Sequence, residues 1–358
     1  MSNILLITQV FFTIVMGMYF FSRMRSETTD KSAVRQKSVK ESERLNSLRK
    51  ISLTEPLTEQ ARPKRLDDIV GQADGIRSLT AALCGPHPQH ILIYGPPGVG
   101  KTAAARLALE YAKQSEGTPF RKNAKFIETD ATIMQYDERC IADALIGSVH
   151  DPIYQGAGAF GMNGIPEPKE GAVSKAHGGV LFIDEIGELH QYQMNKLLKV
   201  LEDRKVYFES AYYNENNRSI PPYIHDIFQN GIPADFRLIG ATTRHPNEIP
   251  EAVRSRCVEI FFNPLTEADR YIIVQKTCIR LNLSIDDNAI RLIAKYTKNG
   301  RDAVKVLQMA QNIISLDRHL KIKTDEVLWA LSSCHYIDNF IASDGSRIID
   351  VEIIGNKK

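Results

Sequence analysis

The feature that most constrains this chain is the stretch Tyr94–Thr102, which reads YGPPGVGKT. It has the spacing G-x-x-x-x-G-K-[ST] of a phosphate-binding loop. The glycines let backbone N–H groups turn toward phosphates, Lys101 brings a cation to the β and γ oxygens, and the Thr102 hydroxyl is spaced to bind Mg²⁺. The apolar run HILIYG leads into the loop and the helical pattern TAAARLALEYAKQ follows it. We therefore expect ATP to be bound by Gly95, Pro96, Pro97, Gly98, Val99, Gly100, Lys101 and Thr102.

A second motif, VLFIDEI, places Asp184 and Glu185 at the end of an apolar strand. We expect Asp184 to hold Mg²⁺, directly or through water. Glu185 is expected to orient and deprotonate the attacking water, because phosphoryl transfer depends more on positioning than on covalent chemistry. The alternative is an ordinary acidic pair at a strand end, which the phosphate-binding loop earlier in the chain disfavours.

An arginine pair occurs in IPEAVRSRCVEIFF, far along the chain from the phosphate-binding loop. A guanidinium placed at the γ-phosphate stabilises the negative charge that spreads in the transition state. We expect Arg256 to be this arginine finger. Arg254 is the alternative, and both could instead be surface charges.

Two further polar residues fit the same chemistry. Thr243 ends LIGATT and can hydrogen-bond the attacking water or the γ-phosphate, with Thr242 as its close rival. Arg301, in NGRDAVKVL, begins a predicted helix and could reach the phosphates from a lid. An exposed arginine at a helix start is the plainer interpretation of Arg301.

The order of apolar runs predicts an α/β fold. Strand-like HILIYG, AKFIETD, GGVLFIDEI and DFRLIGATT alternate with helical patterns, which is typical of a parallel sheet covered by helices on both faces. After FFNPLTEADR helical patterns dominate. We expect a nucleotide-binding domain over residues 62–264, a small all-α lid over 265–337 and a tail over 338–358.

The N-terminus contains a long apolar segment. Ile4–Phe21 is 18 residues without a charge, followed by Arg23 and Arg25. As a helix it would be about 27 Å long, close to the ~30 Å hydrocarbon core of a bilayer. The positive-inside rule then predicts a single-pass cell-membrane anchor over residues 1–22, with a charged linker over 23–61 and the bulk of the chain in the cytoplasm. A cleaved signal peptide is the alternative, but no basic segment precedes the apolar run.

Composition narrows the function classes. The net charge is +2, which does not favour a strongly basic nucleic-acid surface. The five cysteines contain no C-x-x-C pair, so neither a zinc site nor a disulfide framework is indicated.

With these motifs in place, residues 62–333 resemble an AAA+ ATPase. The resemblance makes Gly95–Thr102 the Walker A motif, Asp184 and Glu185 the end of Walker B, Thr243 sensor 1 and Arg301 sensor 2. It implies ATP and Mg²⁺ as cofactors and a homo-oligomer, expected to be a hexameric ring in which Arg256 acts on the ATP of the neighbour. DDIVGQADGI is similar to the segment that packs on adenine, which makes Ile69 and Val70 candidate base contacts.

Within AAA+, HGGVLFIDEIGELHQYQMNKLLKVLEDRKV and the segments around it resemble the ATPase part of membrane-anchored B-type Lon proteases. That resemblance implies unfolded protein substrates, threaded through the ring pore toward a protease. Only a short tail follows Ser333, without room for a Ser–Lys protease domain. We therefore expect no peptidase activity from this chain alone. It would be a natural ATPase-only paralogue or a truncated Lon, with a protease partner possible.

The pore-facing loop is expected within residues 151–177, which are glycine-rich and carry Tyr154 and Phe160. Either ring could grip an unfolded chain, or could pack on the body beneath the loop. The segment RKVYFESAYYNENNRSIPPYIHDIFQNGIPADF suggests a hairpin-like insertion.

Two other functions remain possible. SRC and IGATTR also occur in clamp loaders and RuvB-type motors, so a DNA-acting motor is one alternative, although no nucleic acid is expected. A non-proteolytic partner subunit of a full-length Lon ring is the other.

Overall fold

The computed structural model describes residues 16–18, 41–51, 55–134, 143–150, 165–316 and 320–337. The chain divides into two compact units, Met1–Pro56 and Leu57–Lys358. In the first unit the described residues include an exposed helix over residues 41–50. None of the described helices is long and apolar enough to cross a membrane. Only residues 16–18 of the apolar N-terminal segment are described, so the structure gives the expected anchor no support.

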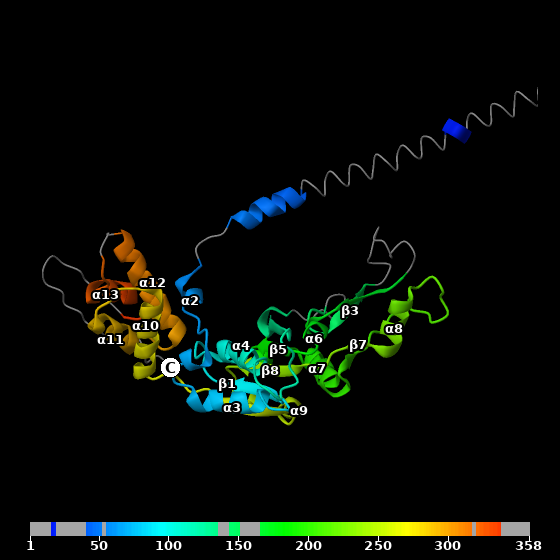
Figure 1. The fold of residues 1–358 in the computed structure, drawn as a ribbon, viewed down its shortest axis with the longest axis horizontal. Coiled ribbons are helices and arrows are strands. Elements are labelled where there is room, and N and C mark those ends of the chain that lie inside the picture. The colour runs from blue at the N-terminus through cyan, green and yellow to red at the C-terminus, as the bar shows by residue number, and fades with distance from the viewer. Residues whose placement is uncertain are drawn as a thin grey trace, which may run out of the picture. The chain divides into compact units, whose positions relative to one another are not determined.

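A five-stranded sheet lies at the centre of the second unit (Figure 1). Its strand order is β2-β5-β8-β1-β9, and every neighbouring pair is parallel. The expected α/β class with a parallel sheet is confirmed. The strands are β1 (His90–Tyr94), β2 (Phe126–Asp130), β5 (Val180–Asp184), β8 (Arg237–Thr242) and β9 (Cys257–Phe261).

Strand side chains point alternately to two apolar layers, because successive residues of a strand face opposite sides of the sheet. Leu92 and Tyr94 pack with the helices on one face, whereas Ile91 and Ile93 pack with those on the other. Burial on both faces explains why β1 reads as a continuous apolar run. The helices are α6 (Ala172–Lys175) and α7 (Gln191–Asp203) on the first face, and α3 (Ala73–Leu83) and α4 (Lys101–Ala112) on the second.

Parallel pairing brings the polar strand ends to one edge of the sheet. Asp130 is in register with Asp184, and Tyr94 is in register with Thr242. The phosphate-binding loop leaves the same edge after Tyr94. Ligands of open α/β sheets bind in the crevice outside the carboxyl ends of the strands, and this edge carries most of the residues expected to act on ATP.

In the described residues after 264, four helices form the segment expected to be the lid. Their bounds agree with the helical patterns in the sequence, and their apolar faces share one core. Thr266 begins the first of them with a capping box, since its side chain accepts from the N–H of Asp269 while Asp269 accepts from the N–H of Thr266. Leu57, from the segment expected to be linker, packs in the lid core. The four helices are α10 (Glu267–Leu281), α11 (Asp287–Tyr296), α12 (Gly300–Leu316) and α13 (Thr324–Ser333), and Leu57 belongs to the short helix α2 (Leu57–Gln60).

Two insertions leave the sheet, and both are closed by antiparallel pairs. The first pair flanks residues 151–164, where the pore-loop candidates Tyr154 and Phe160 lie outside the described residues. The second closes the tyrosine-rich segment, which contains a helix rather than being a simple hairpin. The elements are β3 (Gly147–His150) with β4 (Glu167–Glu170), and β6 (Lys205–Val206) with β7 (Ile232–Pro233) around α8 (Pro222–Asn230).

Candidate active site

The phosphate-binding loop joins β1 to α4. Gly98 and Gly100 have left-handed backbone φ angles of 73° and 98°, which glycine adopts without the cost that a Cβ brings. A Cβ on Gly95 would lie 2.6 Å from the carbonyl oxygen of Phe262, so only glycine fits against the neighbouring chain. The Gly95 N–H donates to the carbonyl of Thr242. The loop conformation therefore depends on these three glycines.

Lys101 begins α4 beneath this loop and is 7% exposed. Its Nζ donates to the carbonyl oxygens of Gly95 at 2.6 Å and Pro96 at 3.1 Å. Burial lowers the pKa of Lys101, while the carboxylates of Glu185 and Asp184 raise it and Arg301 lowers it. The ammonium thus lies within electrostatic reach of three of the residues expected to share its site. Thr102 follows in the first turn of α4.

Asp184 ends β5 and is half-buried. Burial raises the pKa of its carboxyl group, as do Glu185 and Asp130, whereas the Glu185 N–H and Lys101 lower it. A bound cation would relieve this accumulation of negative charge. Among the described residues no group of three or more His, Cys, Asp or Glu side chains is placed to hold a metal. Mg²⁺ needs few ligands from the protein, because it usually keeps several waters and binds one or two carboxylates together with substrate phosphates. The Asp184 carboxylate and the Thr102 hydroxyl fit that preference.

Glu185 has a left-handed backbone, with φ 48° and ψ 47°, an unusual conformation for a residue with a Cβ. Its Oε2 accepts from both the backbone N–H of Thr243 at 3.0 Å and the Thr243 hydroxyl at 3.1 Å. Strained backbone is retained where the surrounding contacts determine it. The two bonds from Thr243 fix the carboxylate at the sheet edge.

The adjacent threonines have different surroundings. Thr242 is fully buried, and its Oγ1 accepts from the backbone N–H of Arg244 at 3.0 Å. Thr243 is exposed and donates to Glu185. Of the two rivals, Thr243 is the one whose hydroxyl is hydrogen-bonded to a residue expected to act on ATP, whereas Thr242 meets Gly95 through its backbone carbonyl.

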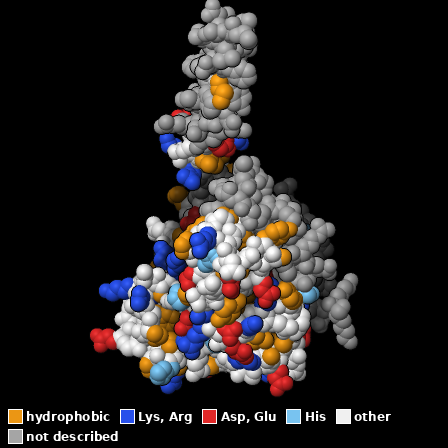
Figure 2. Space-filling view, turned by 90° about the vertical axis from the view of Figure 1, so that its right-hand side faces the viewer, with side chains coloured by type: hydrophobic (Ala, Val, Ile, Leu, Met, Phe, Trp, Pro, Cys, Tyr) orange, Lys and Arg blue, Asp and Glu red, His pale blue; other side chains and the backbone are white. Residues whose placement is uncertain are grey.

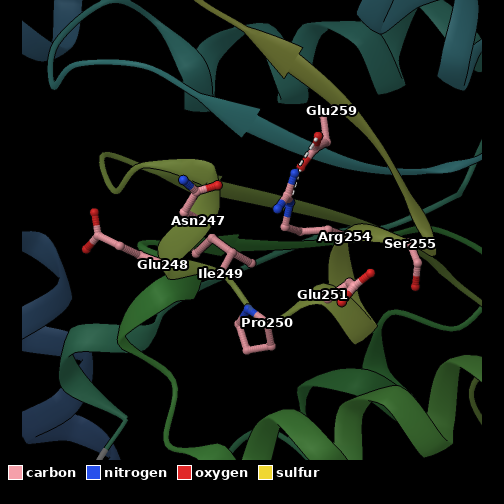
Figure 3. Close-up of a pocket in the computed structure, with 8 residues that line it drawn as sticks. All are labelled: Asn247, Glu248, Ile249, Pro250, Glu251, Arg254, Ser255 and Glu259. Atoms are coloured by element: carbon pink, nitrogen blue, oxygen red, sulfur yellow. Dashed lines mark hydrogen bonds and ion pairs between the residues drawn. The ribbon is translucent and has the colours of Figure 1, made fainter.

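The two arginines are both held by carboxylates of the same chain. Arg254 ends α9 (Glu251–Arg254), and its Nε donates to Glu259 Oε1 at 2.7 Å (Figure 3). Arg256 donates to the Ala252 carbonyl at 2.8 Å and pairs with Glu202 of α7. Glu202 is 55% exposed, whereas Glu259 is 27% exposed. None of these contacts brings either guanidinium to the phosphate-binding loop of its own chain.

A pocket lies beside Arg254, between α9 and the 3₁₀ turn η5 (Pro246–Glu248) (Figure 3). It is lined by Asn247, Glu248, Ile249, Pro250, Glu251, Arg254, Ser255 and Glu259. Arg254 and Glu259 face each other along one side of it.

The lid contributes the start of α12. Arg301 is exposed in its first turn and lowers the pKa of Lys101 through its charge. Two residues earlier, Asn299 packs on the phosphate-binding loop: a Cβ on Gly98 would lie 2.7 Å from Asn299 Oδ1. The same Oδ1 accepts from the Asp302 N–H at 2.9 Å, which caps the helix. Sequence reasoning missed Asn299, although its position just before a predicted helix is typical of a cap.

One of the two expected adenine contacts also lies beside the loop. Ile69 and Val70 are half-buried and follow the 3₁₀ turn η1 (Leu66–Asp68). A Cβ on Gly100 would lie 3.6 Å from Ile69 Cγ2, so Ile69 touches the loop. Gln72, which sequence reasoning missed, exchanges two hydrogen bonds with the backbone of Asn263, at 2.7 and 2.9 Å, and so fixes this segment to the domain boundary.

The sequence is similar to those of several known proteins. A family model described as magnesium chelatase, subunit ChlI, matches residues 65–218. The chain is 56% identical over 332 residues to Lon protease 2 of Bacillus subtilis, a match that covers 93% of this chain and 60% of that protein. The chain thus spans less than two thirds of the length of this relative.

More distant matches follow. The Holliday junction branch migration complex subunit RuvB of Thermotoga petrophila is 25% identical over 279 residues, covering 75% of this chain and 67% of that protein. A solved structure of a RuvB mutant from Thermotoga maritima has a TM-score of 0.52 and 21% identity, and the match covers 76% of this chain and 73% of that one. At that identity the structural match shows the fold alone.

Proposed function

We propose, from the premise that this chain is an AAA+ ATPase strongly homologous to Lon protease 2 over most of its length, that it couples ATP hydrolysis to the unfolding and translocation of protein substrates. The fold and both matches support ATP hydrolase activity. The observation that supports protein unfolding and translocation is the 56% identity to a Lon protease across 93% of this chain.

In this proposal each polar residue at the sheet edge has one task. Lys101 and the N–H groups of the glycine loop hold the phosphates, because backbone donors and a cation suit a polyanion. Thr102 and Asp184 would hold Mg²⁺, which neutralises the charge developing on the phosphates. Glu185 accepts a proton from the attacking water, and Thr243 keeps its carboxylate oriented through the two hydrogen bonds to Oε2.

The site becomes complete in a ring, proposed to be a hexamer. Arg256 contacts Glu202 and Ala252 in its own chain, and neither belongs to the phosphate-binding loop or the sheet edge. A guanidinium held apart from its own site is suited to act on the γ-phosphate of a neighbour. Arg301 supplies a second cation from the lid.

A protein substrate fits the surface better than DNA does. Figure 2 shows Lys and Arg side chains interspersed with Asp and Glu on the face that it draws, and the whole chain has a net charge of +2. A motor that tracks DNA gathers basic side chains along the phosphate backbone. We propose that Tyr154 and Phe160 contact the unfolded chain in the pore. We also propose that Ile4–Phe21 lies in the cell membrane, with the bulk of the chain in the cytoplasm. A protease domain or partner would receive the threaded substrate.

The test measures ATP turnover of the full chain in detergent with and without added polymer. Casein, an unfolded protein, is expected to raise turnover, and duplex or single-stranded DNA is expected to leave it unchanged. Lys101→Ala should abolish ATP binding, while Glu185→Gln should bind ATP and hydrolyse it poorly. Stimulation by DNA and not by casein would refute the proposed substrate and favour a DNA-acting motor.

A further inference from the structure

The side chain of Tyr94 connects the phosphate-binding loop to the strand that follows the arginine pair. Tyr94 is the last residue of β1, directly before Gly95, and is 3% exposed. Its ring stacks on Phe261, with centroids 5.1 Å apart, and its hydroxyl donates to Glu259 Oε1 at 3.0 Å. Burial raises the pKa of Tyr94, and Glu259 raises it further, so the hydroxyl keeps its proton and remains a donor.

Glu259 accepts from two directions at once. It lies on β9 in register with Leu92 of β1, which places its side chain on the same face as Tyr94. Arg254 donates to it through Nε at 2.7 Å and through Nη2 at 3.4 Å. The hydrogen bond from Arg254 lowers the pKa of Glu259 most, and the bond from Tyr94 lowers it too, against the effect of burial. The carboxylate therefore stays ionised between its two donors.

The arginine at the end of this network ends α9, the helix to which the proposed finger, Arg256, is hydrogen-bonded. Arg254 ends α9 and is bonded to Glu259 (Figure 3). Arg256 donates to the carbonyl of Ala252, which belongs to α9. Any shift of α9 relative to β9 thus moves the support on which the Arg256 guanidinium rests.

We propose that Tyr94, Glu259 and Arg254 form a positioning link, through which the phosphate-binding loop of one protomer sets the place of the Arg256 that it offers to its neighbour. Arg254 is then a positioning residue and not the finger. The inference rests on the proposed ring, in which Arg256 acts across a subunit boundary.

The backbone adds a second connection at the same point. The N–H of Phe262 donates to the carbonyl of Tyr94 at 2.8 Å, and Gly95 packs directly on Phe262. Movement of the loop at Gly95 is therefore transmitted to β9 through close contacts, since packed interiors shift between discrete arrangements and do not deform freely. A buried tyrosine hydroxyl requires a hydrogen-bond partner, and here that partner, Glu259, is also bonded to Arg254, so the hydroxyl is the part of the link to remove.

The experiment uses mixed rings, so that the link and the hydrolysis being measured lie in different protomers. Wild-type chain is mixed with a large excess of Glu185→Gln chain, and turnover is expressed per wild-type protomer. In the second mixture the excess chain also carries Tyr94→Phe, which keeps the ring stacking and loses only the hydroxyl. In the third it carries Arg256→Ala. The altered chains hydrolyse ATP poorly, and the turnover of each altered chain alone is subtracted, so any remaining change is an effect on the wild-type neighbour.

We expect the Tyr94→Phe mixture to turn over ATP about fivefold more slowly than the Glu185→Gln mixture, the size expected when one hydrogen bond of a network is lost. Tyr213→Phe is the matched control, because the Tyr213 hydroxyl is hydrogen-bonded to His225 in the insertion away from α9, and it should have no effect. If Arg256→Ala slows the neighbour and Tyr94→Phe does not, the positioning link is refuted while the ring stands. If Arg256→Ala has no effect either, the ring arrangement itself is refuted, and the inference with it.

Discussion

The adjacent threonines after β8 allow the same substitution to test two different roles. Thr243→Val removes a hydroxyl that donates to Glu185 at 3.1 Å but keeps the backbone N–H that donates to the same oxygen at 3.0 Å. Thr242→Val removes a buried acceptor, and the N–H of Arg244 then loses the oxygen that it donates to at 3.0 Å. Valine has nearly the shape of threonine and suits a strand, so each change is close to the loss of one polar atom.

The magnitudes follow from burial and charge. Thr243 is exposed and its backbone N–H still donates to Glu185, so we expect loss of the hydroxyl to raise the barrier to hydrolysis by about 1.4 kcal/mol, which is about a tenfold fall in kcat. Its stability should change by no more than about 0.5 kcal/mol. An unsatisfied buried donor costs about 1–3 kcal/mol, so Thr242→Val should lower the free energy of unfolding by that amount. Turnover of the folded Thr242→Val protein should stay within about twofold of wild type, because its hydroxyl does not contact Glu185.

The assay pairs steady-state ATP turnover of the assembled protein with urea unfolding of the same samples. We expect Thr243→Val to lose turnover and keep its stability, and Thr242→Val to lose stability and keep its turnover. A large rate loss in Thr242→Val at full stability, with Thr243→Val unaffected, would contradict this expectation and make Thr242 the residue that acts on ATP.

Two other consequences can be measured directly. Burial lowers the pKa of His90 from 6.5 to about 4, so the unfolded chain takes up a proton before the folded chain does, and stability falls as pH drops through this window. Between pH 7 and pH 5 the wild type should lose about 2 kcal/mol more unfolding free energy than His90→Gln does, and equal losses would show that this imidazole is not buried as described. Gly98→Ala should weaken ATP binding, because the left-handed backbone costs about 1 kcal/mol with a Cβ and that Cβ would lie 2.7 Å from Asn299 Oδ1. Calorimetry should find that the double variant Gly98→Ala with Asn299→Ala loses less free energy of ATP binding than the two single variants lose in sum. Strict additivity of the two losses would mean that Asn299 does not pack on the loop.

Local patterns predicted the strands that are buried on both faces, because such strands read as continuous apolar runs. HILIY and VLFID became β1 and β5, and the four lid helices agree with their patterns. The strand β9 was missed. Its sequence CVEIF carries Glu259 in the middle, and the groups that satisfy that carboxylate, Tyr94 and Arg254, come together only in the folded chain.

At the candidate active site too, local patterns identified the residues whose spacing along the chain is fixed. Gly95–Thr102, Asp184 and Glu185 are recognisable because their chemistry requires fixed spacing along the chain. Asn299 and Gln72 act through contacts with Gly98 and Asn263, and spacing along the chain gives no sign of either contact. The hydrogen bonds between Glu185 and Thr243 likewise depend on two strands being neighbours.

In the proposed ring a protomer alone holds an incomplete catalytic centre, which an arginine from its neighbour completes. The direct measurement is ATP turnover per protomer across a dilution series, with the assembled fraction followed by light scattering in the same samples. We expect turnover to rise with the assembled fraction, and Arg256→Ala to stay at the low value of the dilute wild type throughout. Equal turnover by isolated and assembled wild-type protomers would contradict this expectation.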